Sequence, residues 1–135
     1  MSTGRETFHK SERLCSQKII SALFENGNII YTSLFKLVWL FSPSDLPSPA
    51  QAAFTVSKKG FRKAVTRNLI RRRMREAYRK TKLNLYSLLE TEHIRITFVI
   101  IFRGTTVVDF PAIDSAMKEV IGKLSSQIRE NQQKS

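Results

Sequence analysis

The sequence has little of the chemistry that forms disulfides, binds zinc or crosses membranes. Its one cysteine, Cys15, cannot close an intramolecular disulfide, and the two histidines, His9 and His93, offer no paired zinc-ligand spacing. This composition is typical of a reducing compartment, so we expect a cytoplasmic protein. The longest unbroken apolar runs, 37–41 and 98–102, are far shorter than the roughly 20 residues of a membrane-spanning helix. The polar N-terminus also lacks the apolar core of a secretory signal.

Motifs of catalysis are missing too. The sequence contains no glycine-rich phosphate loop, no nucleophile elbow, no paired histidines or cysteines, and no Asp-x-Asp pair for two metal ions. The 11 acidic residues are scattered along the chain. We therefore expect no catalytic residue in this chain, and any catalysis must come from a partner.

Acidic residues are scarcest where basic residues are most frequent. The 135 residues include 23 Lys and Arg against 11 Asp and Glu, a formal net charge of +12. Segment 58–82 contains a single acid, Glu76, and carries +11 of that charge. Its cations are Lys58, Lys59, Arg62, Lys63, Arg67, Arg71, Arg72, Arg73, Arg75, Arg79, Lys80 and Lys82. Like charges at helical spacing repel each other, so this clustering predicts a polyanion outside the chain.

The hydrophobic pattern of the first half predicts one helix and up to three strands. The predicted elements are a helix over 16–26, a strand over 34–41, a proline-rich loop over 42–49 and a strand over 52–57. The third strand is either the weak segment 29–32 or the result of a break within 34–41. Ser16 is the expected N-cap of the helix, and Gly27 its stop. The simplest pairing joins 52–57 antiparallel to 34–41 through the loop.

The second half predicts a basic helix, a strand and a final helix. The expected ranges are a helix over 63–80, a leucine-rich stretch over 83–89 that is either a helical extension or a packed loop, a strand over 94–103 and a helix after 109. Asp109 is a good N-cap for the last helix, with Pro111 in its first turn.

These elements define the expected fold class. The sequence predicts an α+β domain, a two-layer α/β sandwich with a mixed sheet of about four strands in the order αβββαβα. We expect one domain over 1–135, with 1–12 and 130–135 flexible.

The basic helix has two faces at 100° per residue. One face is apolar or small and should pack on the sheet, and it holds Thr66, Ile70, Met74, Ala77 and Thr81, with Tyr78 at its edge. The opposite face holds Asn68, Arg72, Arg75 and Arg79, flanked by Arg71 and Lys82. Such a face predicts binding to the phosphate backbone of a nucleic acid.

Two consecutive runs resemble a known family. The run Thr55-Val-Ser-Lys-Lys-Gly60 precedes the helical run Ala64-Val-Thr-Arg-Asn-Leu-Ile-Arg-Arg-Arg-Met-Arg-Glu76. Together they resemble the protein component of bacterial ribonuclease P, whose basic helix carries an Arg-Asn-Arg signature followed by spaced cations. Leu69 departs from that signature, since it stands where the family has the second arginine, and Arg73 is an additional cation near it. The positions of Arg13-Leu14, Phe24 and Gly27 also resemble the start of the family's sequences.

The resemblance implies a function and its residues. It implies the protein subunit of ribonuclease P, the ribonucleoprotein endonuclease and hydrolase that removes the 5′ leader from precursor tRNA. The residues implied for binding the catalytic RNA are Lys58, Lys59, Arg62, Lys63, Arg67, Asn68, Arg71, Arg72, Arg75 and Arg79. A cleft for the single-stranded leader is implied at Ile20, Phe24, Phe35, Leu37, Phe54 and Val56, with Lys58 at its rim. Core packing is an equally good interpretation of these apolar residues.

The same resemblance implies cofactor and partners. Mg²⁺ is expected in the holoenzyme, bound mainly by RNA, and Asn68 is the one residue here that would hold a magnesium-bound water, unless its side chain bonds the local backbone. The implied partners are the ribonuclease P RNA subunit and precursor tRNA, with no membrane and no obligate protein partner.

Two other function classes remain open from the residues. A non-catalytic RNA-binding or ribosomal protein would share the basic helix without a leader cleft. A DNA-binding regulator would place this helix in the major groove, but the sequence offers no helix-turn-helix partner for it.

Overall fold

The structure, a computed structural model, describes residues 8–42 and 46–133. Its elements are η2 (Lys10–Glu12), α1 (Gln17–Asn26), β1 (Asn28–Tyr31), β2 (Phe35–Ser42), β3 (Ala50–Val56), α2 (Ala64–Thr91), β4 (Arg95–Phe102) and α3 (Phe110–Gln133). The predicted order αβββαβα is confirmed, with the short 3₁₀ helix η2 added before it. The predicted caps are also present, since Ser16 Oγ accepts a hydrogen bond from Ile19 N and Asp109 Oδ1 accepts one from Ala112 N.

The sheet has the strand order β1-β2-β4-β3. β1 pairs antiparallel with β2, β2 pairs antiparallel with β4, and β3 pairs parallel with β4. The expectation that 52–57 pairs antiparallel with 34–41 is therefore wrong. The reason is that α2 carries the chain back along the sheet, so β4 enters between β2 and β3 in the direction of β3.

The helix α2 is longer than its basic part. It contains no proline or glycine and continues to Thr91, so the leucine-rich stretch is a helical extension. Leu85 and Leu89 are fully buried on the side of the helix that also buries Ile70 and Met74. This single apolar side keeps the whole helix against the sheet and leaves the opposite side of its first half in solvent.

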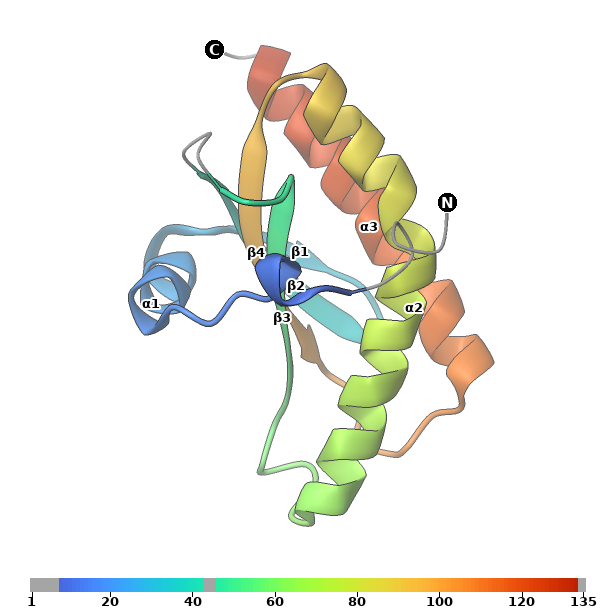
Figure 1. Cartoon of the computed structure of the whole chain (residues 1–135). Helices are drawn as coiled ribbons and strands as arrows, with labels where there is room; N and C mark the ends of the chain where they lie inside the picture. Colours follow the sequence, from blue (N-terminus) through green and yellow to red (C-terminus); the bar gives the residue numbers. More distant parts are fainter. Residues whose placement is uncertain (1–7, 43–45, 134–135) are drawn as a thin grey trace.

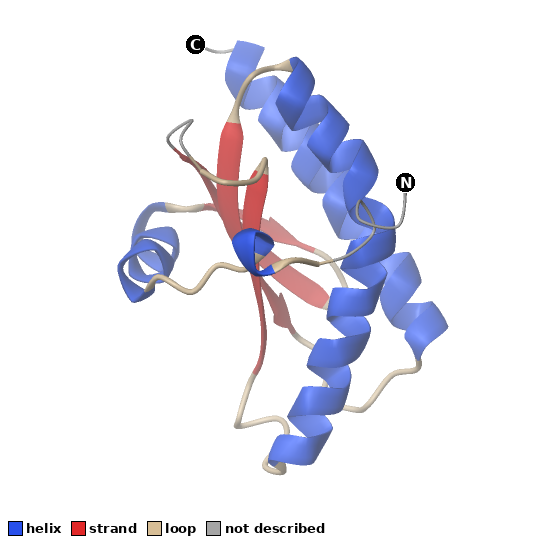
Figure 2. Ribbon diagram, in the orientation of Figure 1, coloured by secondary structure: helices blue, strands red, loops and turns tan. Residues whose placement is uncertain are grey.

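The helices divide between the two faces of the sheet. α2 and α3 cover one face, while α1 lies on the other side (Figures 1 and 2). The main core lies between the sheet and the α2/α3 layer and includes the fully buried Trp39. Trp39 Nε1 donates a 2.8 Å hydrogen bond to Gln127 Oε1, which ties β2 to α3.

A second, smaller apolar cluster lies under α1. It is formed by Leu14, Leu23, Val38 and Val99. Gly27 ends α1 within this contact, and a Cβ at this position would collide with Val38 Cγ1 and with the carbonyl oxygen of Leu23. α1 is thus seated on the sheet face opposite to the basic helix.

Parts of the two ends that we expected to be flexible lie within the described residues. Residues 10–12 form η2, in which Glu12 is buried, and α3 runs to Gln133. Of these two ranges, residues 1–7 and 134–135 lie outside the described residues. Over the described part of the chain, no helix combines the length and the apolar character needed to cross a membrane.

Candidate nucleic-acid interface

A tight turn leads from the sheet into the basic helix. β3 ends at Val56, and Lys59 N donates to Ser57 Oγ at 3.1 Å. Arg67, one turn inside α2, reaches back and donates through Nη1 to the carbonyl oxygens of Phe61 and Arg62 at 2.7 and 2.8 Å. One predicted RNA contact, Arg67, is therefore half-buried and stabilises the turn itself.

The cations around the start of α2 are unfavourable for the helix alone. Lys58, Lys59, Arg62 and Lys63 are all exposed, and the N-cap Lys63 makes no side-chain cap hydrogen bond. A helix N-terminus carries partial positive charge and free N–H groups, so it favours an anion there. This placement of positive charge is of no benefit to the isolated protein and favours a phosphate partner.

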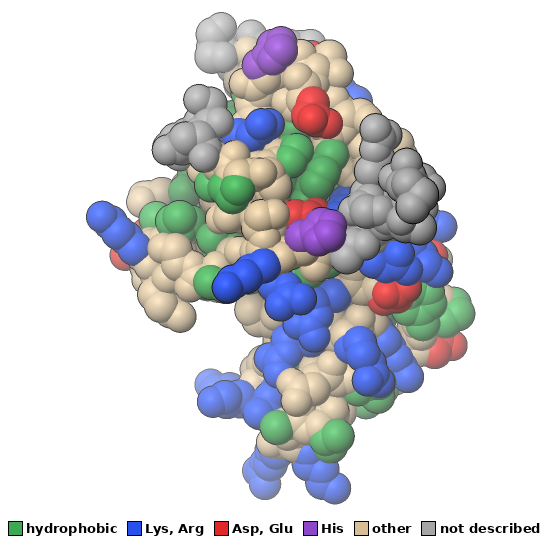
Figure 3. Space-filling model, viewed as in Figure 1, with side chains coloured by type: hydrophobic (Ala, Val, Ile, Leu, Met, Phe, Trp, Pro, Cys, Tyr) green, Lys and Arg blue, Asp and Glu red, His purple; other side chains and the backbone are tan. Residues whose placement is uncertain are grey.

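The outer side of the first half of α2 continues this charge. Asn68, Arg72 and Arg75 are exposed, and Arg71, which is half-buried, donates to Asn68 Oδ1. Figure 3 shows Lys and Arg side chains gathered over this half of the helix and the turn before it. We call the following set the cationic surface: Lys58, Lys59, Arg62, Lys63, Asn68, Arg71, Arg72 and Arg75.

Within the described ranges, the arginines of this surface on α2 have no acidic partner. Among the described residues, no acid forms an ion pair with Arg71, Arg72 or Arg75. Although Arg75 is exposed, partial burial of its guanidinium, and then the neighbouring charges of Arg13 and Arg71, lower its pKa below the ordinary value. An arginine still remains protonated near neutral pH, so the mutual repulsion persists until an anion binds.

Three other cations of the segment are engaged inside the protein. Arg79 Nε donates to Glu76 Oε2 at 3.2 Å, and this contact lowers the pKa of the Glu76 carboxyl. Arg73 Nη1 donates to the carbonyl oxygen of Val108 at 2.7 Å and so stabilises the loop before α3. Arg73 therefore does not take the place of the family's arginine at position 69, where this chain has Leu69. Lys82, expected beside the cationic face, is fully buried and that expectation is wrong.

The residues predicted for the leader cleft separate onto the two faces of the sheet. Ile20 is half-buried and Phe24 is 52% exposed, both on α1. The four sheet residues Phe35, Leu37, Phe54 and Val56 instead lie in the main core under α2 and α3. The prediction placed these four side chains on the wrong face of the sheet. Alternate side chains of a strand point to opposite faces, and α1 lies on the face to which these four do not point.

The face beside α1 holds different side chains. In one row across the sheet, Tyr31 lies opposite Lys36, Lys36 opposite Ile101, and Ile101 opposite Thr55. Tyr31 is 54% exposed. The centroid of its ring lies 5.8 Å from Lys36 Nζ and 4.9 Å from Arg103 Cζ. We call Ile20, Phe24, Tyr31, Lys36, Thr55 and Ile101 the α1-side surface. In the sequence, Lys36 was the residue that could have identified this face, since a charged residue within an apolar strand indicates the face that is less covered.

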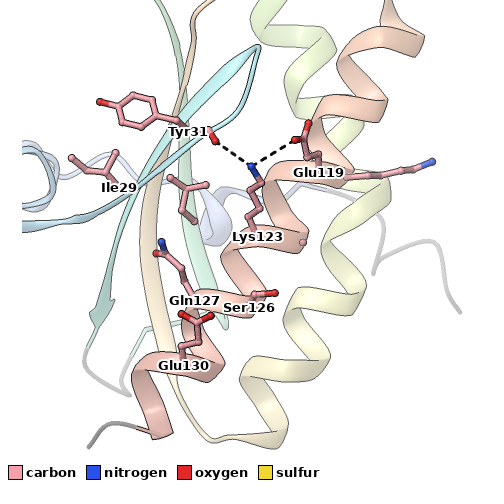
Figure 4. A pocket seen from close by; sticks show the side chains of 10 residues that line it. Ile29, Tyr31, Glu119, Lys123, Ser126, Gln127 and Glu130 are labelled. Atoms are coloured by element: carbon pink, nitrogen blue, oxygen red, sulfur yellow. Dashed lines mark hydrogen bonds and ion pairs between the residues drawn. The ribbon is translucent and has the colours of Figure 1, made fainter.

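A separate hollow of about 640 Å³ lies between β1 and α3 (Figure 4). Lys123 Nζ donates to the carbonyl oxygen of Tyr31 at 3.4 Å and lies 3.7 Å from Glu119 Oε2. Its charge is therefore compensated locally, and no residue of the cationic surface lines this hollow.

Comparisons with known proteins agree at the levels of sequence and fold. The family model described as ribonuclease P matches residues 8–125. The ribonuclease P protein component of Chlorobium phaeobacteroides is 34% identical over 131 residues, covering 91% of this chain and 88% of that protein. The one of Porphyromonas gingivalis is 28% identical and covers 88% and 87%.

Solved structures share the fold. The RNase P protein of Staphylococcus aureus superposes with a TM-score of 0.69 at 18% identity, over 85% of this chain and 96% of that one. The protein of Thermotoga maritima gives a TM-score of 0.65 at 20% identity, over 83% and 96%. At these identities the likeness concerns the arrangement of the elements.

Proposed function

Since the chain belongs to the family of bacterial ribonuclease P protein components, and so to an RNA-processing endonuclease, we propose a division of labour between its two surfaces. The cationic surface binds the RNA subunit, and the α1-side surface binds the single-stranded 5′ leader of precursor tRNA. The observation that carries this proposal is the set of exposed cations on α2 that no described acid neutralises.

Binding by the cationic surface is electrostatic. Each phosphate that a Lys or Arg neutralises releases condensed counterions, so the affinity for RNA falls steeply with salt. Arg72 and Arg75 are exposed and free to make such contacts. Arg67 and Arg79 contribute less directly, because their guanidinium groups already donate to Phe61, Arg62 and Glu76.

The α1-side surface suits unpaired bases. Phe24 and Tyr31 present large exposed rings, and stacking of a base on an aromatic ring contributes about 1 to 3 kcal/mol. Lys36, in register with Tyr31, supplies a charge for the backbone of the same strand. An aromatic ring beside a cation accepts single-stranded RNA without requiring one base sequence.

The part of the chain that the structure describes does not fit a magnesium site. Asn68 Oδ1 accepts a hydrogen bond from Arg71, and the side chains around it are cationic. In the described parts of the chain, no three His, Cys, Asp or Glu side chains come together as metal ligands. We therefore assign this chain no metal-dependent step and propose that the RNA holds the Mg²⁺ of the holoenzyme.

The test is cleavage of precursor tRNA by a bacterial ribonuclease P RNA at limiting Mg²⁺, with and without this protein. We expect strong stimulation at the mature 5′ end, and weaker stimulation by the matched protein that carries Arg72→Ala and Arg75→Ala. Tight RNA binding without stimulation would overturn the proposal in favour of a non-catalytic RNA-binding protein.

A further inference from the structure

The segment before α1 places one arginine outward between two buried side chains. Arg13 has extended backbone angles, with φ −90° and ψ 128°, so its side chain points away from those of its neighbours. Glu12 is 4% exposed and Leu14 is 5% exposed, whereas Arg13 is exposed. Leu14 N donates to the carbonyl oxygen of Ala52 at 2.9 Å, which fixes the segment to β3.

The attachment on the other side of Arg13 is a buried polar cluster. Glu12 Oε1 accepts hydrogen bonds from Lys82 Nζ and, at 2.6 Å, from Tyr86 Oη. Glu12 Oε2 accepts from the backbone N of His9 at 2.7 Å. Lys82 is itself 1% exposed, so both charges of this pair are inside the protein. A buried ion pair adds little stability compared with an apolar pair. Here the hydrogen bonds of Glu12 to Lys82, Tyr86 and the backbone of His9 attach the N-terminal segment to α2.

The segment lies along one side of α2. Lys82, Tyr78, Arg75 and Arg71 follow each other at spacings of three or four residues, which places them on one side of the helix. Glu12 contacts Lys82, and the ring of Phe8 packs edge-on against that of Tyr78 with centroids 5.8 Å apart. Arg13 Cζ lies 5.7 Å from the centroid of the Phe8 ring.

Arg13 therefore lies next to the exposed cations of α2. Partial burial lowers the pKa of Arg75 most, and the charges of Arg13 and then of Arg71 lower it further. No described acid pairs with Arg13. Three guanidinium groups from two separate segments thus repel one another at one place on the surface.

We propose that Arg13 is a further phosphate-binding residue of the cationic surface, and that Glu12 is the positioning residue that holds it there through Lys82. This inference rests on the proposed function. It extends the cationic surface from α2 and the turn before it to the N-terminal segment, so that two parts of the chain far apart in sequence bind RNA together.

The test measures the affinity for ribonuclease P RNA over a series of salt concentrations. Arg13→Ala is compared with Arg129→Ala, an exposed arginine on α3 outside the cationic surface. The double variant E12Q/K82M removes the buried pair without changing the net charge or leaving one charge unpaired. Its matched control, E119Q/K123M, removes an exposed pair of the same residue types on α3. A cooperative thermal melt defines the temperature range in which each variant is folded, and binding is measured within it.

Arg13→Ala should weaken binding and lower the slope of log affinity against log salt by up to about one unit, while Arg129→Ala leaves it unchanged. E12Q/K82M should give the same loss of RNA affinity and of salt slope as Arg13→Ala. Adding Arg13→Ala to it should give no further loss of either, since both changes act through one contact. If Glu12 contributed only to stability, E12Q/K82M would lower the melting temperature, and the salt slope of RNA binding by the folded variant would equal the wild-type value.

Separate outcomes overturn the separate claims. A wild-type slope for Arg13→Ala, with a reduced slope for Arg72→Ala, removes Arg13 from the surface and leaves the proposed function intact. A wild-type slope for E12Q/K82M alone removes the positioning role of Glu12. Salt-independent or absent binding by the wild-type protein instead contradicts the proposed function itself.

Discussion

Arg67 on α2 donates a 2.7 Å hydrogen bond to the carbonyl oxygen of Phe61, in the turn that precedes the helix. A residue at the centre of the basic run therefore holds the local structure as well as facing solvent. We expect Arg67→Ala to lower the free energy of unfolding by about 1.5 to 3 kcal/mol, because hydrogen bonds of a charged donor are lost. Chemical denaturation measures this, with Arg72→Ala as the matched arginine that makes no such bond. Equal stability of the two variants would contradict the role of Arg67 in the turn.

The exposed arginines of α2 should behave differently. Arg72→Ala and Arg75→Ala each remove one phosphate contact, so each should lower the salt slope of RNA binding by up to about one unit. Neither substitution should change the free energy of unfolding by more than about 0.5 kcal/mol, since both side chains are exposed. Binding titrations at several salt concentrations test this, and unchanged slopes in both variants would refute the assignment.

The buried side of the same helix provides a test of its orientation. Ile70 is fully buried, so Ile70→Asp places an unpaired charge in the core and should abolish cooperative folding. Val65 lies on the same helix at 72% exposure, and Val65→Asp should leave a cooperative melt. A wild-type melting temperature for Ile70→Asp is the result that this structure does not allow.

The ring of Phe24 should contribute to leader recognition. Because it is 52% exposed on α1, Phe24→Ala should cost little stability and should reduce the preference for precursor tRNA over mature tRNA. The loss of one stacked base corresponds to about 1 to 3 kcal/mol, or roughly 5- to 150-fold in relative affinity. The measurement is binding of both RNAs to the holoenzyme, with Leu83→Ala as an apolar control at similar exposure on α2. An unaltered preference for the leader would exclude Phe24 from its binding site.

The buried pair of Glu12 and Lys82 should make stability depend on pH. Burial alone raises the pKa of Glu12, but hydrogen bonds from Lys82, Tyr86 and the backbone of His9 outweigh it, and the pKa lies below the ordinary 4.5. A carboxyl whose pKa is lowered in the folded state stabilises it above the ordinary pKa, and this contribution disappears as the pH falls through the lowered value. Relative to E12Q/K82M, the wild type should therefore lose free energy of unfolding below pH 4.5. Urea denaturation over pH 3 to 7 measures the difference, and a constant difference would contradict this role.

Much of the local structure follows from the sequence. Ser16, Gly27 and Asp109 mark the ends of helices because their effects depend on the nearest turn alone. The strands over β2 and β4 follow from apolar and β-branched residues within a few positions. The charge of α2 is likewise local, since one segment carries nearly all of the net charge, and its outer side follows from the helical repeat.

The pairing of strands and the face of the sheet were decided only by the tertiary structure. β3 pairs with β4 instead of β2 because α2 returns the chain across the sheet, and a strand's own sequence does not specify its neighbour. Phe35, Leu37, Phe54 and Val56 lie under α2 and α3 for the same kind of reason. Alternation separates two faces of a strand, but it does not say which helix covers each.

The sequence alone thus determined that this protein has a cationic helix on an α+β scaffold and which family it resembles. Only the tertiary structure decided which cations are free, because burial and hydrogen bonds between distant segments leave no local pattern. Lys82 is buried against Glu12, which lies 70 residues earlier, and Arg73 is bound to Val108, 35 residues later. The same long-range packing places Arg13 against the ring of Phe8, which packs on Tyr78 of α2.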